Sequence, residues 1–148
     1  MENRRLSREH TPLMADLLKK GFPVSDWSQN DLDRFLLLES SHAWGCFLEG
    51  ELISFCLIQK VAEEAEILLL VVHPEVRKKG MGRSLLETIV TEVKGDTVSR
   101  LFLEVSVENE TAIQFYNKLG FQRVGIRKNY YMKKANPAAY TMVKFLHS

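Results

Sequence analysis

Hydrophobic and polar residues recur with different periods along the chain, and these periods divide it into expected strands and helices. Residues 67–72 form an unbroken apolar run, which is typical of a strand covered on both faces. A basic, glycine-containing segment follows, and apolar residues then recur at helical spacing from Leu85 to Val93. Gly95 is a stop signal for that helix, which we predict over about residues 81–94. The centre of the chain is therefore expected to fold as strand, loop and helix.

The segment before this centre carries two helix starts and a glycine turn. Thr11 followed by Pro12 is typical of the first residues of a helix. Ser28, with Asp31 three residues later, resembles a capping box, and Gly50 between two apolar runs predicts a hairpin. The expected elements are, in order, an edge strand at 3–7, a helix at 11–21, a helix from residue 28, hairpin strands at 43–48 and 52–59, and an acidic loop at 61–66. The apolar stripes of the two helices are expected to contain Leu13, Leu17 and Leu18, and Phe35, Leu36 and Leu38.

The segment after the centre predicts three more strands and one more helix. Residues 101–107 are strongly β-prone. Asn109 or Thr111 can cap a helix that ends at Gly120. The last strands are expected at residues 121–126 and 140–146, separated by a loop at 128–137. This order of elements predicts an α/β (α+β) protein, with a mixed central sheet of six to seven strands flanked by about four helices.

Length and composition are those of one ordinary globular domain covering residues 1–148. The net charge of +1 argues against a general nucleic-acid-binding protein. No stretch approaches a membrane span and the first residues lack the apolar centre of a signal peptide, so we expect a cytoplasmic protein. Cys46 and Cys56 lack metal-ligand spacing and are expected to be reduced thiols in the core.

The segment between the central strand and helix has the composition of an anion-binding loop. It reads Arg77-Lys78-Lys79-Gly80-Met81-Gly82. Glycine lets the backbone approach a ligand closely, and the unpaired N–H groups and dipole at a helix start favour phosphate. It does not end in the Gly-Lys-Ser/Thr of a Walker loop, and Leu85 stands where a dinucleotide fingerprint has its third glycine. A phosphate-binding loop and a simple tight turn are both compatible with these residues.

A second motif lies in residues 102–121. Asn109, Ala112, Tyr116 and Gly120-Phe121 have the spacing N-x-x-A-x-x-x-Y-x-x-x-G-F. Together with Arg77-x-x-Gly80-x-Gly82, this motif resembles the GNAT superfamily of acetyl-CoA-dependent N-acetyltransferases. The tail at residues 127–131 makes the chain most similar to the RimI-type subgroup, the ribosomal-protein alanine N-acetyltransferases. The resemblance runs from about residue 65 to residue 142.

This resemblance implies a fold, a cofactor and a set of cofactor contacts. The implied fold is the single-domain GNAT fold, and the implied cofactor is acetyl-CoA without a metal. In the family, the asparagine of the second motif contacts the CoA chain and the tyrosine hydroxyl points at the thioester sulfur. The implied cofactor-binding residues are Leu70, Val71, Val72, Arg77, Lys78, Lys79, Gly80, Met81, Gly82, Arg83, Asn109 and Tyr116.

Acetyl transfer to an amine requires a neutral amine, a polarised carbonyl and a proton for the departing thiolate. Residues 67–72 contain no acid, and the resemblance points to Glu104 as the base, acting through water. Its place in a covered strand would partly desolvate the carboxylate and make it a stronger base. Tyr116 is the candidate acid, because a phenol can donate to a thiolate within reach. The alternatives are a structural Glu104 paired with a Lys or Arg, and a Tyr116 that only packs.

The motifs constrain the acceptor less than the donor. Phe22, Asn129, Tyr130 and Tyr131 are candidates to line an acceptor groove, although loop aromatics also serve as packing. The resemblance implies a protein N-terminal amine as acceptor, such as that of a ribosomal protein. The alternatives are a small amine, disfavoured when polycationic by the basic residues of 127–134, and a CoA-binding module without turnover. No nucleic-acid or membrane partner is expected, and the protein is expected to be a monomer or a weak dimer.

Overall fold

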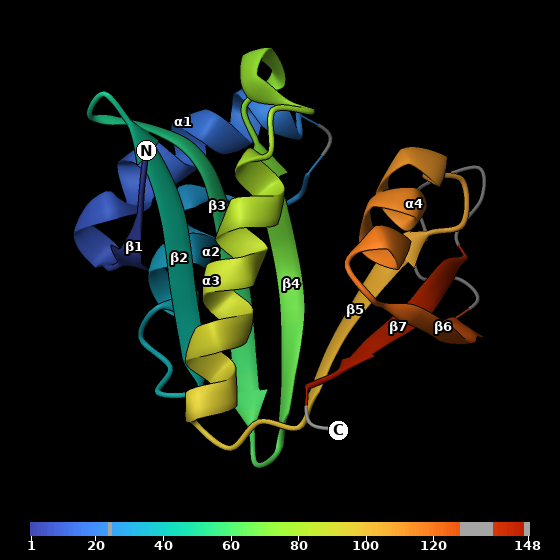
Figure 1. Cartoon of the computed structure of the whole chain (residues 1–148). Helices are drawn as coiled ribbons and strands as arrows, with labels where there is room; N and C mark the ends of the chain where they lie inside the picture. The colour runs from blue at the N-terminus through green and yellow to red at the C-terminus, as the bar shows by residue number, and fades with distance from the viewer. Residues whose placement is uncertain (24, 128–137, 147–148) are drawn as a thin grey trace.

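A seven-stranded sheet organises the molecule, with the strand order β1-β2-β3-β4-β5-β7-β6 (Figure 1). This computed structural model describes residues 1–23, 25–127 and 138–146. The strands are β1 (Glu2–Leu6), β2 (Ser41–Leu48), β3 (Glu51–Val61), β4 (Glu64–Val72), β5 (Arg100–Ser106), β6 (Gln122–Arg127) and β7 (Ala139–Phe145). The α-helices of the described residues are α1 (Thr11–Gly21), α2 (Gln29–Phe35), α3 (Met81–Gly95) and α4 (Glu110–Lys118), with 3₁₀ turns η1 (Arg8–His10) and η2 (Pro74–Val76). The expected mixed α/β sheet with about four helices is confirmed.

The first four strands form an antiparallel meander built on two tight turns. The β2–β3 hairpin turns at Glu49-Gly50, and both residues have positive φ angles, 52° and 82°. Such angles suit the right-handed twist of a hairpin and favour glycine at the second position. The acidic segment expected as a loop is instead the second hairpin, with Ala62 and Glu63 between the ends of β3 and β4. In its second half acidic and apolar residues alternate, which is the period of a strand with one covered face.

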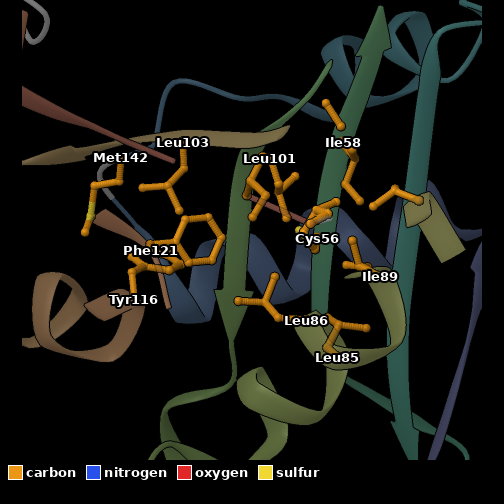
Figure 2. Close-up of a cluster of buried hydrophobic side chains, with 14 of the residues drawn as sticks. Cys56, Ile58, Leu85, Leu86, Ile89, Leu101, Leu103, Tyr116, Phe121 and Met142 are labelled. Atoms are coloured by element: carbon orange, nitrogen blue, oxygen red, sulfur yellow. The ribbon is translucent and has the colours of Figure 1, made fainter. Parts of the chain in front are cut away.

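Two hydrophobic cores lie on opposite faces of this sheet. The α3/α4 core contains the side chains labelled in Figure 2, which are Cys56, Ile58, Leu85, Leu86, Ile89, Leu101, Leu103, Tyr116, Phe121 and Met142. The α1/α2 core lies on the other face and includes Met14, Leu18, Leu32, Phe35, Phe55, Leu69 and Val71. A bulge at Leu68 lets β4 supply Ile67 to the first core and Leu69 to the second. Strand β4 therefore contributes to both cores.

The capping signal predicted the start of α2 correctly. The apolar stripes of α1 and α2 predicted the buried residues only in part. Ser28 Oγ accepts a hydrogen bond from Asp31 N at 3.1 Å, and Ser28 N donates to Asp31 Oδ2 at 2.9 Å, so the expected capping box is confirmed. Leu38 is 51% exposed because α2 ends at Phe35, so its expected place in the core was wrong. Leu13 is likewise 47% exposed, and Met14 takes the buried position in α1.

The two cysteines are buried, as expected. Cys46 and Cys56 are free thiols, and burial raises the pKa of both. The thiolate form is therefore disfavoured at neutral pH, as in inert core cysteines. Among the described residues, no helix is both long and apolar enough to cross a membrane.

Candidate active site

Strands β4 and β5 pair over only part of their length. Their parallel register runs from Glu64 opposite Arg100 to Ile67 opposite Leu103, and β5 then continues against β7 alone. Figure 1 shows the two strands diverging towards their carboxyl ends. We call residues 68–72 of β4 and 104–106 of β5 the β4–β5 fork. Ligands of open α/β sheets bind at the carboxyl ends of strands, so the fork is the natural place for a site.

Within the described residues, the fork leaves backbone donors of β4 without a strand partner on one side. His73 N donates to Ile53 O of β3 at 2.8 Å, which marks these two residues as a hydrogen-bonded pair of the antiparallel ladder. Such pairs alternate along the ladder, so the N–H and C=O of Val71 also point to β3. Those of Leu70 and Val72 point the other way, towards the side that β5 has left.

The glycine loop connects the end of β4 to the first turn of α3. Its residues Arg77, Lys78, Lys79 and Gly80 are exposed, and Gly80 is the N-terminal cap of α3 with a left-handed φ of 83°. The N–H groups of the first helical turn have no partner within their own helix, and the helix dipole makes this end positive. The loop therefore has the backbone of an anion site, with two lysines beside it.

Gly82 lies where α3, β4 and α4 meet. A Cβ atom at Gly82 would lie 3.4 Å from Phe115 Cζ and 3.4 Å from Val72 Cγ2. Both distances are at the short limit of ordinary van der Waals contact, so α3 begins close to both neighbours. The same contact shows that α4 approaches the start of α3 beside the β4–β5 fork.

The Arg77 side chain is engaged with the protein backbone. Its Nε donates to Val72 O at 3.2 Å, and its guanidinium also donates to Gly21 O at 2.5 Å. The sequence predicts Arg77 as a cofactor contact, and nothing in its sequence neighbourhood indicates a partner 56 residues away at the end of α1. These backbone partners could be found only in three dimensions.

Asn109 and Tyr116 occupy the two ends of α4. Asn109 caps the helix, with its Oδ1 accepting from Ala112 N at 3.1 Å. Tyr116 is 8% exposed, and its ring lies edge-on to that of Phe121 at 5.5 Å (Figure 2). It also lies edge-on to Phe115, with the ring centroids 5.2 Å apart. Lys144 of β7 donates to Leu119 O at 2.6 Å and so holds the carboxyl end of α4, a contact that the sequence did not indicate.

Glu104 is the first residue of β5 beyond its last pair with β4. Leu103 and Val105 point into the α3/α4 core, so the Glu104 side chain points to the opposite face of the sheet. There it lines a cavity of about 320 Å³ together with Glu64, Glu66, Phe102 and Thr141. Glu64 of this wall forms an ion pair with Arg100 at 2.9 Å.

Glu104 and Tyr116 therefore approach the fork from opposite faces of the sheet. Tyr116 comes from α4 with the α3/α4 core, which is also the face of the glycine loop and α3. Glu104 faces the side on which α1 and α2 pack against the neighbouring strands. An acid on one face and a base on the other would suit a reaction in which two substrates meet at the fork from opposite sides.

Of the four candidate acceptor residues, only Phe22 lies among the described residues. It caps the end of α1, with its N–H donating to Leu18 O at 2.8 Å, and it packs against the α1/α2 core. The preceding residue, Gly21, lies directly against the end of β4, so Phe22 is near the fork. Asn129, Tyr130 and Tyr131 lie outside the described residues.

Comparisons with known proteins identify the family of this chain. The sequence pattern of the Acetyltransferase (GNAT) family matches residues 11–121. The ribosomal protein bS18-alanine N-acetyltransferase of Escherichia coli strain K12 is 34% identical over 112 residues, which cover 74% of this chain and 72% of that protein. The N-alpha-acetyltransferase RimI of Mycobacterium tuberculosis is 31% identical over 142 residues, which cover 93% of this chain and 87% of that protein.

Solved structures agree with the sequence comparison. The crystal structure of the ribosomal-protein-S18-alanine N-acetyltransferase from Escherichia coli matches with a TM-score of 0.91 over 99% of this chain and 94% of that chain. The identity over that alignment is 26%. The match of the family pattern, the similar relatives and the shared fold lead to one conclusion: the chain belongs to the acetyltransferase (GNAT) family.

Proposed function

We propose that this protein transfers the acetyl group of acetyl-CoA to the N-terminal amine of a ribosomal protein whose first residue is alanine. The observation that carries the proposal is the likeness to the Escherichia coli enzyme whose name states this acceptor, at 34% identity and with a TM-score of 0.91. The acceptor is a cytoplasmic protein, and the enzyme acts in the cytoplasm.

The donor is held between the glycine loop and the β4–β5 fork. Backbone N–H groups of residues 80–83 bind the pyrophosphate of acetyl-CoA, and Lys78 and Lys79 balance its charge. The N–H of Leu70 or Val72 binds the acetyl oxygen and stabilises the negative charge that develops on it. The Oδ1 of Asn109 caps α4, and the N–H₂ of the same amide, whose direction this cap fixes, contacts the CoA chain.

The transfer is direct, with the base and the acid on opposite faces of the sheet. Glu104, acting through a water molecule, accepts the proton lost by the attacking amine. The amine nitrogen forms a bond to the thioester carbon, and the carbon–sulfur bond breaks with its electron pair leaving on sulfur. The Tyr116 hydroxyl then donates a proton to the CoA thiolate. Phe22 forms part of the acceptor wall, and Asn129, Tyr130 and Tyr131 are its remaining candidates.

A panel of acceptors tests the proposal. CoA-thiol release from acetyl-CoA is measured between pH 7 and pH 9 with an Ala-led N-terminal peptide of a ribosomal protein. The control is the same peptide with its α-amine blocked, and small amines and diamines complete the panel. We expect release with the free peptide and background release with the blocked one. Release with free amines alone would support acetyltransferase activity but would contradict the ribosomal-protein acceptor.

A further inference from the structure

The end of α1 and the end of β4 are joined by the Arg77 side chain. The guanidinium donates to Gly21 O at 2.5 Å, and Nε donates to Val72 O at 3.2 Å. Gly21 is the last residue of α1, where unpaired carbonyls carry partial negative charge that favours a cation. Arginine suits this position because its planar group can donate to two acceptors in fixed directions at once.

The two elements approach each other so closely that a side chain at Gly21 would meet β4. A Cβ atom at Gly21 would lie 2.7 Å from Val71 Cγ1 and 3.0 Å from Val72 O. Arg77 therefore holds together the end of α1 and the end of β4 at a point where a residue larger than glycine would fit only if the neighbouring atoms moved. The Val72–His73 peptide is also held from its other side, since His73 N donates to Ile53 O at 2.8 Å.

The two carbonyls belong to different halves of the site. Val72 ends the β4 side of the fork, where the acetyl group is bound in the proposed reaction. Gly21 precedes Phe22, the described candidate for the acceptor wall. The relative position of donor and acceptor depends on the distance between these two elements, and misplacement of reacting groups by about 1 Å can cost 10²-fold in rate.

We propose that Arg77 is a positioning residue that sets the acceptor wall against the donor strand, instead of a ligand of the CoA pyrophosphate. The proposal rests on the function proposed above. Backbone N–H groups and the two neighbouring lysines serve the pyrophosphate, while Arg77 donates from Nε to Val72 O and from a terminal guanidinium nitrogen to Gly21 O.

The test compares Arg77→Gln with Lys79→Gln, a neighbour in the same loop whose substitution removes the same charge. CoA affinity is measured by calorimetry, and KM is measured for acetyl-CoA and for the Ala-led peptide. For Arg77→Gln we expect the peptide KM to rise about tenfold and the CoA Kd to change less than about threefold. For Lys79→Gln we expect the larger change in CoA Kd and an unchanged peptide KM. Arg77→Lys should recover only part of the peptide KM, because a single ammonium replaces the planar group.

A third measurement does not depend on turnover. Hydrogen exchange at the amides of Phe22 and Ser25, which donate to Leu18 O and Phe22 O, should quicken in Arg77→Gln and stay unchanged in Lys79→Gln. The inference is overturned if Arg77→Gln weakens CoA binding as much as Lys79→Gln does, with unchanged peptide KM and exchange. If the wild-type protein fails to acetylate the peptide, the proposed acceptor is wrong, while exchange and CoA affinity still decide the role of Arg77.

Discussion

At the scale of single residues, Tyr116 combines packing with the proposed chemistry. Its ring is buried against Phe115 and Phe121, and these contacts do not require the hydroxyl. We predict that Tyr116→Phe keeps the fold and the CoA affinity while kcat falls by about 10²-fold or more, the usual contribution of a positioned acid. Steady-state CoA release, calorimetry and a thermal melt measure the three quantities. A variant with full kcat would show that Tyr116 only packs.

The pH dependence of kcat/KM should show whether Glu104 acts as a base. A free α-amine has a pKa of about 8, so most of the peptide N-terminus is protonated at pH 7 and neutral at pH 9. A base that removes the proton is therefore needed more at pH 7. We predict that the ratio of kcat/KM between the wild-type protein and Glu104→Gln falls as the pH rises from 7 to 9. Thr141→Val changes another residue of the same cavity wall and serves as the control, with a ratio that stays constant. A constant ratio for Glu104→Gln would favour a structural carboxylate.

At the scale of elements, the glycine loop contains two left-handed residues, Lys78 with a φ of 66° and Gly80 at the start of α3. Gly80 has a φ of 83° with nothing within 4 Å of a Cβ placed there, so the cost of a side chain is conformational and not steric. We predict that Gly80→Ala lowers the free energy of unfolding by about 1 kcal/mol. Gly95→Ala is the matched control, since Gly95 also has open space around it but no positive φ, and it should be neutral or slightly stabilising. Urea unfolding measures both, and equal effects would contradict the account.

Helix α4 is held at its carboxyl end by a lysine from β7. Lys144→Met removes the hydrogen bond to Leu119 O and should cost about 1 kcal/mol of unfolding free energy. Because Tyr116 is on this helix, kcat should also fall, while CoA affinity changes little. Lys118→Met, an exposed change at the same helix end, should have a smaller effect on both. If Lys144→Met and Lys118→Met lower kcat equally, loss of charge and not loss of the cap is responsible.

Local signals predicted the elements where the deciding interactions are local. The Ser28–Asp31 capping box and the Gly50 turn depend on residues a few positions apart, and both predictions are confirmed. Residues 61–66, expected as an acidic loop, instead contain the ends of two strands, and acidic and apolar residues alternate in their second half. Arg77 and Lys144 donate to backbone carbonyls that are distant in the sequence. Because every residue has a backbone carbonyl, no residue type marks these partners, and no sequence pattern could have indicated them.

At the scale of the whole molecule, β4 unites the two cores and the candidate site. The bulge at Leu68 turns Ile67 to one core and Leu69 to the other, immediately where β5 diverges. The sequence predicted the covered strand and the glycine loop after it. The pairing of β5 with β4 ends at Ile67 and Leu103, while its pairing with β7 continues to Ser106, and both partners are distant in the sequence, so the fork became visible only in the assembled sheet.

In the proposed mechanism, binding of the donor and the chemistry of transfer depend on different residues around the β4–β5 fork. The most direct test is the double variant Glu104→Gln/Tyr116→Phe, studied by calorimetric titration with CoA and by acetylation of an Ala-led peptide. The account predicts a CoA Kd within about threefold of the wild-type value and a turnover lower by about 10³-fold or more. Loss of CoA binding, or turnover near the wild-type rate, would contradict it.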